Sequence, residues 1–133
     1  GIARGRCDIS GGDHAPHVKF EKEVEVDRTQ FGIVGLETEL GLFIELLVQR
    51  HKTIGLPRLI EMLTVNPARL LGLKAGSLSL GAEADITLID PEMEWTVDAS
   101  SFLSASRNTP FDGWKLKGRA VRTIVAGKTV WQL

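Results

Sequence analysis

The hydrophobic period of the sequence changes near residue 73, and this change limits the folds open to the chain. From residue 36 to about 51 the apolar residues recur at helical spacing, which predicts an amphipathic helix. A second helix is predicted from Pro57. A third, short helix is predicted at Asn66, which can cap it, and Gly72 can end it. Beyond this point the pattern favours strands.

The second half of the chain is predicted to form a small β unit. Residues 84–90 alternate as a half-buried strand that Asp90-Pro91 would end, and residues 95–97 predict a shorter strand. Residues 121–125 and 129–133 flank Ala126-Gly127-Lys128 and predict a closing hairpin. A parallel (β/α) barrel needs eight strand–helix units and about 250 residues. The 133 residues therefore predict two partial units.

A polar cluster stands near the start of the chain. Cys7–Ser10 is predicted as a short strand that continues through Gly11-Gly12 into Asp13-His14-Ala15-Pro16-His17. Barrel enzymes place their chemistry where polar side chains follow a strand end. A proline restricts its own φ and favours an extended residue before it, so Asp13 and His17 are expected to be held apart.

The residue types of this cluster allow two interpretations. A carboxylate such as Asp13 can bind a divalent cation or transfer a proton, and an imidazole such as His17 can bind metal or donate to an anionic substrate. Aspartate, histidine and proline are also ordinary turn residues. A functional site and a capped turn are equally good interpretations of the residue types alone.

Composition excludes some classes of function. The net charge is −1 and no basic run occurs, which argues against a nucleic-acid or anionic-lipid partner. The single cysteine, Cys7, suits a reducing compartment, so a cytoplasmic protein is expected. No apolar stretch has the length of a transmembrane helix. Because the chain opens with Gly1, this start is not expected to be the natural one.

Five segments resemble, in order along nearly the whole chain, segments of the dihydroorotase family in the amidohydrolase superfamily. The segments are Asp13–His17, Glu21–Glu25 with Phe31–Thr38, Thr64–Leu73, Gly81–Ile86 and Ser106–Trp114. Two places depart from the family's pattern: Ser10-Gly11-Gly12 stands where relatives commonly carry an apolar strand that ends in threonine, and Gln30 replaces a usual proline or alanine.

The resemblance implies the α/β fold class: a TIM-like (β/α)8 metal-dependent hydrolase barrel plus a small β-sandwich made from both chain ends. This chain would be the C-terminal third of that enzyme. Residues 1–73 would supply the last barrel strand, the active-site loop and the following helices. Residues 74–133 would supply the C-terminal part of the sandwich.

The resemblance also implies the chemistry, which is the reversible hydrolysis of L-dihydroorotate to N-carbamoyl-L-aspartate in pyrimidine synthesis. Asp13 would bind one of two zinc ions and act as general base and acid. His17 would hold the substrate carboxylate, and Phe31 and Gly32 would present main-chain groups to the substrate. The family's other metal ligands have no counterpart here, so the isolated chain is expected to be inactive.

Other functions stay open. One is a non-catalytic pseudo-dihydroorotase or interaction subunit, of the kind that supports aspartate transcarbamoylase. Another is a hydantoinase or allantoinase, whose rings lack the carboxylate and which usually lack histidine at position 17. Besides a small-molecule substrate, a homodimer or a complex with aspartate transcarbamoylase is the expected assembly. His14 is interpreted as structural, and Asn108-Thr109-Pro110 as a turn without chemistry.

Overall fold

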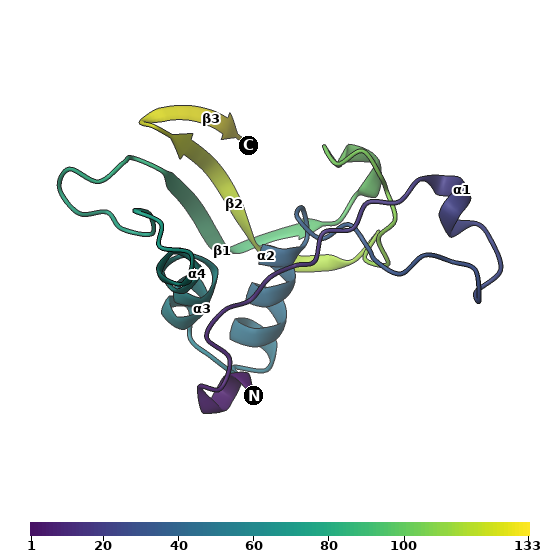
Figure 1. Cartoon of the computed structure of the whole chain (residues 1–133), viewed down its shortest axis with the longest axis horizontal. Coiled ribbons are helices and arrows are strands. Elements are labelled where there is room, and N and C mark those ends of the chain that lie inside the picture. Colours follow the sequence, from purple (N-terminus) through teal and green to yellow (C-terminus); the bar gives the residue numbers. More distant parts are fainter.

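The computed structural model describes residues 1–133 and shows a mixed α/β chain (Figure 1). Short helices dominate the first half of the chain and a three-stranded sheet the second. The elements, in order, are η1 (Ile2–Arg4), α1 (Lys19–Lys22), α2 (Glu39–Phe43), η2 (Ile44–Arg50), α3 (Leu56–Leu63), α4 (Val65–Leu70), β1 (Ile86–Thr96), η3 (Ala99–Ser101), β2 (Lys115–Val125) and β3 (Lys128–Gln132).

The helices largely follow the sequence prediction. The first long helix begins at Glu39, three residues later than predicted, and its second half, η2, is a π-helix that ends at Arg50. Pro57 lies in the first turn of α3, as predicted. None of the helices has the length and apolar character needed to cross a lipid bilayer.

The cap predicted at Asn66 is wrong. Helix α4 begins one residue earlier, at Val65, and no side chain caps it. The amide Nδ2 of Asn66 instead donates to the main-chain oxygen of Asp8, 2.8 Å away. The predicted stop at Gly72 is confirmed, because this glycine adopts a φ of 65° directly after the helix.

The sheet is antiparallel, in the order β1-β2-β3. The sequence predicted two strands where the structure has one, since β1 runs on past Asp90-Pro91. Pairing with β2 is irregular between Asp90 and Glu94, as expected around a proline that has no N–H for the ladder. The side chain of Asp90 accepts from the N–H of Glu92 at 2.9 Å and stabilises this irregularity.

The closing hairpin is confirmed. Strands β2 and β3 are joined by Ala126 and Gly127, whose φ angles of 47° and 76° are those of the tight turns that favour hairpins. The N–H of Ala126 donates to the Asp85 carboxylate at 2.8 Å, which ties this turn to the approach to β1. Strand β2 begins at Lys115, six residues earlier than predicted.

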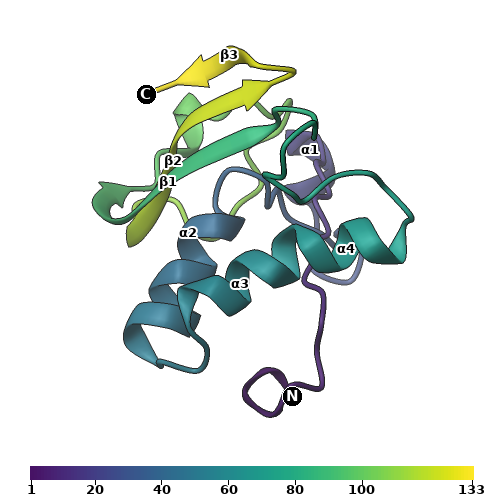
Figure 2. The same ribbon diagram turned by 90° about the vertical axis from the view of Figure 1, so that its left-hand side faces the viewer.

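The helices lie on one side of the sheet (Figure 2). Helix η2 and strand β2 lie close together at Gly118, where an added Cβ would come within 2.5 Å of Ile44. Gly41 of α2 similarly faces the ring of Trp95 on β1. Only 13 of the 133 residues are buried, so the core is small. One buried cluster of the core consists of Val34, Val97, Ala99, Phe102 and Leu116, and the helices bury Ile44, Leu59, Met62 and Ala68.

The strand predicted at Cys7–Ser10 is wrong. This segment is extended chain that bonds to helix α3: the N–H of Ser10 donates to the oxygen of Met62 at 3.3 Å, and the guanidinium of Arg58 donates to Asp8 at 2.7 Å. A strand needs a neighbouring strand for its ladder of hydrogen bonds, and none lies beside this segment in the 133 residues.

Candidate functional site

Asp13 lies on an exposed loop, where its carboxylate makes no hydrogen bond or ion pair within the chain. Its backbone is left-handed, with a φ of 42°, which aspartate tolerates better than most residues. Residues with a sparsely populated backbone conformation cluster at functional sites. The carboxylate is therefore free to bind an external group or to exchange a proton.

The glycine before Asp13 has a structural reason. A Cβ at Gly12 would collide with the carboxylate of Glu39, and a Cβ at Gly35 would lie 2.9 Å from the oxygen of Gly12. The loop thus packs closely against the start of α2, and a side chain at position 12 would require the Glu39 carboxylate to move. The glycine that departs from the family pattern at position 12 is thus the residue that lies against Glu39.

The pKa values of two carboxyl groups near the loop, those of Glu37 and Glu39, are shifted in opposite directions. Burial raises the pKa of Glu39, whose Oε1 is buried without a hydrogen-bond partner. Burial also acts to raise the pKa of Glu37, but hydrogen bonds from the hydroxyl and N–H of Ser104, at 2.6 and 2.8 Å, outweigh it and lower that pKa. The ionised form is therefore stabilised at Glu37 and destabilised at Glu39.

His14 has a structural role, as its sequence context indicated. Its Nδ1 accepts from the N–H groups of Gly35 and Leu36 at 3.1 and 3.3 Å. Beside it, the N–H of Ala15 donates to Ile33 at 2.9 Å, and residues 14 and 33 form a parallel bridge. Because Nδ1 is already an acceptor for two backbone groups, it is not available to bind a metal ion.

His17 is held between two partners. Its Nε2 donates to the main-chain oxygen of Phe31 at 2.8 Å. Its Nδ1 lies 3.3 Å from a carboxylate oxygen of Glu21, a hydrogen bond that forms when Nδ1 carries a proton. The side chain is 21% exposed. His17 is thus positioned by the Phe31 carbonyl while its other nitrogen faces a carboxylate.

Phe31 and Gly32 come together with His17, although 14 residues separate them in sequence from it. The Phe31 side chain is 98% exposed, so only its main chain takes part in this cluster. Gly32 has a φ of 116°, and a Cβ there would lie 2.5 Å from that of Ala15 and 3.3 Å from His17 Nε2. The N–H groups of Phe31 and Gly32 donate no hydrogen bond within the chain.

Sequence reasoning missed Asn108, which was interpreted as part of a turn without chemistry. Its side chain reaches the loop from the segment that precedes β2 and contacts His17, Ala15 and Gly32. The one available signal was its place in the Ser106–Trp114 segment of the family resemblance. No local pattern reveals a contact that spans 91 residues.

The family follows from comparison with known proteins. Residues 33–130, which include most of the helices and nearly the whole sheet, match the profile of the amidohydrolase family. The chain belongs to the amidohydrolase family.

The relatives are longer than this chain. A dihydroorotase from Geobacter sp. (strain M21) is 47% identical over 132 residues, which are 99% of this chain and 31% of that protein. A dihydroorotase from Aquifex aeolicus (strain VF5) is 48% identical over the same shares of each chain. The amidohydrolase relatives therefore extend well beyond the part that matches.

Solved structures agree on the fold. The L-hydantoinase (dihydropyrimidinase) from Arthrobacter aurescens superposes with a TM-score of 0.91 at 34% identity, over 98% of this chain and 30% of that one. A D-hydantoinase (dihydropyrimidinase) from Thermus sp. gives a TM-score of 0.80 at 24% identity over the same shares. The architecture of the described residues is thus that of part of an amidohydrolase.

Amidohydrolases are typically metal-dependent, and a metal site needs several donor side chains close together. No three histidine, cysteine, aspartate or glutamate residues gather in the 133 residues. The free carboxylate of Asp13 can supply one ligand, whereas a zinc site takes three or four protein ligands. The described residues do not fit a complete metal site, and no step through a metal is derived from them.

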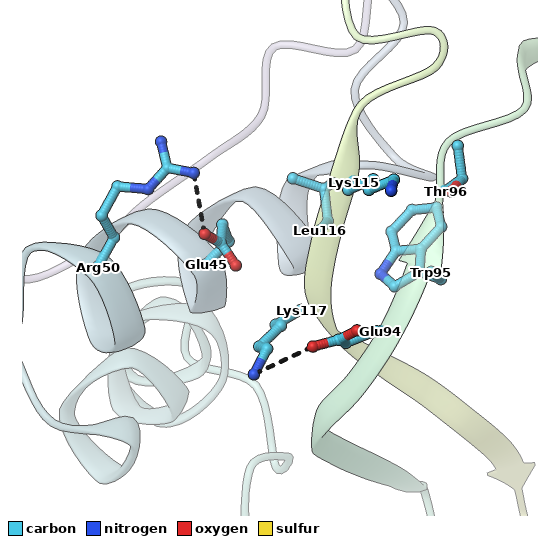
Figure 3. A pocket seen from close by; sticks show the side chains of 8 residues that line it. All are labelled: Glu45, Arg50, Glu94, Trp95, Thr96, Lys115, Leu116 and Lys117. Atoms are coloured by element: carbon cyan, nitrogen blue, oxygen red, sulfur yellow. Dashed lines mark hydrogen bonds and ion pairs between the residues drawn. The ribbon is translucent and has the colours of Figure 1, made fainter.

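Two cavities differ in their relation to the site. One of about 420 Å³ lies between α1 and the segment 105–108, and is lined by His17, Lys22, Arg107 and Asn108 among others. The other, of about 440 Å³, lies between η2 and strands β1 and β2 (Figure 3).

Most of the charged side chains that line the cavity of Figure 3 are paired with one another, and Lys115 is the exception. Arg50 pairs with Glu45 at 3.0 Å, and Lys117 pairs with Glu94 at 3.3 Å. None of its lining residues belongs to the Asp13 loop. We assign the candidate site to the loop and not to this cavity.

Proposed function

We propose that the full-length protein containing this chain is a dihydroorotase, which reversibly hydrolyses the cyclic amide of L-dihydroorotate to N-carbamoyl-L-aspartate. The observation that carries the proposal is the 46–48% identity to proteins named dihydroorotase across nearly the whole chain. The gathering of His17, Phe31 and Gly32 on the loop of Asp13 supports it.

For the architecture, we propose a TIM-like barrel with a small β-sandwich. Residues 1–73 would then belong to the barrel and residues 74–133 to the sandwich. The small core and the segment 7–10, extended but without a partner strand, fit a chain that packs against further strands in the full-length protein.

Asp13 would transfer the proton. Hydrolysis of a cyclic amide requires a base that removes a proton from the attacking water and an acid that protonates the leaving nitrogen. The Asp13 carboxylate is exposed and makes no contact within the chain, so it can accept that proton and deliver it. Within the 133 residues no group fixes the orientation of the Asp13 carboxylate.

His17 would bind the substrate carboxylate. In the structure its Nδ1 already faces a carboxylate, that of Glu21 at 3.3 Å, and a substrate carboxylate would take this place. The unpaired N–H groups of Phe31 and Gly32 lie beside it and can donate to substrate oxygens. An imidazole N–H and two main-chain N–H groups match an anionic ring better than a neutral one.

Zinc remains part of the proposal for the full-length protein only. Two ions per site are expected, with Asp13 as one ligand and the others contributed from outside the 133 residues. The isolated chain is therefore expected to bind zinc weakly and to have no activity. A homodimer or a complex with aspartate transcarbamoylase also remains a prediction.

Replacement of His17 by alanine in the full-length protein tests the substrate class. A charge-assisted hydrogen bond contributes roughly 1.5–3 kcal/mol, so kcat/KM for dihydroorotate should fall about ten- to hundred-fold. Turnover of dihydrouracil or hydantoin, which lack the carboxylate, should fall far less. His51→Ala is the matched control, because this exposed histidine ends η2 and its ring makes no hydrogen bond.

The outcomes separate the alternatives. Equal losses on charged and neutral rings would assign His17 to the scaffold. A parent that prefers neutral rings would favour a hydantoinase, in line with the likeness to L-hydantoinase. A parent without turnover of any ring would favour the non-catalytic subunit.

A further inference from the structure

The side chain of Asn108 forms an unusually complete set of hydrogen bonds. Its Oδ1 accepts from the N–H of His17 at 3.2 Å and from the hydroxyl of Ser106 at 2.6 Å. Its Nδ2 donates to the main-chain oxygens of Ala15 and Gly32 at 3.1 and 3.2 Å. A primary amide has one acceptor atom and two donor hydrogens, and all are used here.

The four partners fix the orientation of this amide. An N–H can only donate and a carbonyl can only accept, so a rotated amide would face His17 N–H with a donor and two carbonyls with an acceptor. An aspartate at position 108 has the same shape and could accept the hydrogen bonds that Oδ1 accepts. Its second oxygen, however, would face the main-chain oxygens of Ala15 and Gly32 without a proton to donate. The site therefore requires asparagine in chemistry as well as in size.

Asn108 is itself anchored. Its main-chain oxygen accepts from the N–H of Val34 at 3.1 Å, and Val34 is a fully buried residue of the core. The hydroxyl of Ser106, which has a single proton to donate, lies within hydrogen-bonding distance of both Asn108 Oδ1 and the main-chain oxygen of His17. The contact thus connects the core to both sides of the loop, across separations of 76 to 93 residues in sequence.

We propose that Asn108 is a positioning residue that sets the spacing between His17 and Gly32, and thereby the affinity for the anionic substrate. This proposal rests on the proposed function, which makes these two positions substrate contacts. One amide bonds the main chain of both, so any shift of one relative to the other breaks a hydrogen bond. Asn108 makes no hydrogen bond to Asp13, so the proton-transfer step does not depend on it.

The test uses Asn108→Asp in the full-length protein, with Asn108→Ala as a second variant. Asn66→Asp is the matched control, since it makes the same change where the amide donates to a single backbone oxygen, that of Asp8. The measurements are kcat and KM for dihydroorotate, and hydrogen exchange of the amides in residues 13–34. Loss of two donated hydrogen bonds should raise KM at least about tenfold and leave kcat little changed. Exchange in residues 13–34 should accelerate.

A merely structural role would give a different result. Partial misfolding lowers the active fraction, and with it the apparent kcat, without changing KM. An unchanged KM in the soluble Asn108 variant, or an equal rise in the Asn66→Asp control, would overturn the proposal. A parent that turns over no dihydroorotate would refute the proposed function, and hydrogen exchange would still decide the Asn108 contact. Unchanged exchange in residues 13–34 would then refute it.

Discussion

Adding a single methyl group at Gly32 should disable the candidate site while leaving the fold in place. Gly32 adopts a φ of 116°, which side chains of L-residues rarely accept, and an added Cβ would lie 2.5 Å from the Cβ of Ala15. Ordinary contacts between such atoms begin near 3.4 Å. The loop at residue 15 or 32 must therefore move by about 1 Å, and misplacement on this scale can cost about 10²-fold in rate.

The magnitude also follows from backbone strain. A residue forced into a sparsely populated backbone conformation costs about 1–3 kcal/mol. If the loop relieves this strain only by moving the groups that contact the substrate, kcat/KM falls by about five- to 150-fold. The added Cβ would also lie 3.3 Å from Nε2 of His17 and disturb its hydrogen bond to Phe31. The expected loss in kcat/KM for dihydroorotate is thus about 10²-fold.

Gly11→Ala is the matched control for Gly32→Ala. It adds the same methyl group to the segment that carries Asp13. No atom lies within 4 Å of a Cβ at position 11, and the φ of Gly11 is not left-handed. Steady-state kinetics and urea unfolding of the full-length protein would be measured for both variants. A Gly32→Ala protein with the kcat/KM of the parent, or an equal loss in Gly11→Ala, would refute the reasoning.

Two further predictions concern carboxyl groups. Asp13→Asn in the full-length protein should lower kcat by about 10²–10⁴-fold with an unchanged melting temperature, and near-normal turnover would reassign Asp13 to a structural role. Glu39→Gln should raise the free energy of unfolding at neutral pH, because the parent holds a carboxylate without a partner there. The free energy of unfolding of the parent should recover as the pH falls through the raised pKa of Glu39. Glu37→Gln should do the opposite, because the lowered pKa of Glu37 stabilises the fold above its unfolded-state pKa and this contribution is lost as the pH falls through the folded value. Urea unfolding as a function of pH checks both signs, and equal behaviour of the two variants would contradict the assignment.

Features governed by neighbours in sequence were predictable. Pro57 begins a helix, Gly72 ends one, and Ala126-Gly127 turns a hairpin, because each depends on the φ and hydrogen-bonding capacity of a few adjacent residues. The family also came from sequence segments in order along the chain, and the match over residues 33–130 bears it out. The errors at Cys7–Ser10 and Asn66 arose where the outcome depends on distant partners: residues 7–10 lack a neighbouring strand, and the side-chain amide of Asn66 bonds to Asp8 and does not cap the helix.

The sequence by itself determined the longer helices, the closing hairpin, the family and the residue types available for chemistry at Asp13 and His17. Only the tertiary structure decided which of these residues meet. The packing of β2 against η2 depends on the absence of a side chain at Gly118, and the shape of the loop depends on Asn108. Such contacts join residues dozens of positions apart, and periodicity in a sequence carries information only about neighbours on the same helix or strand.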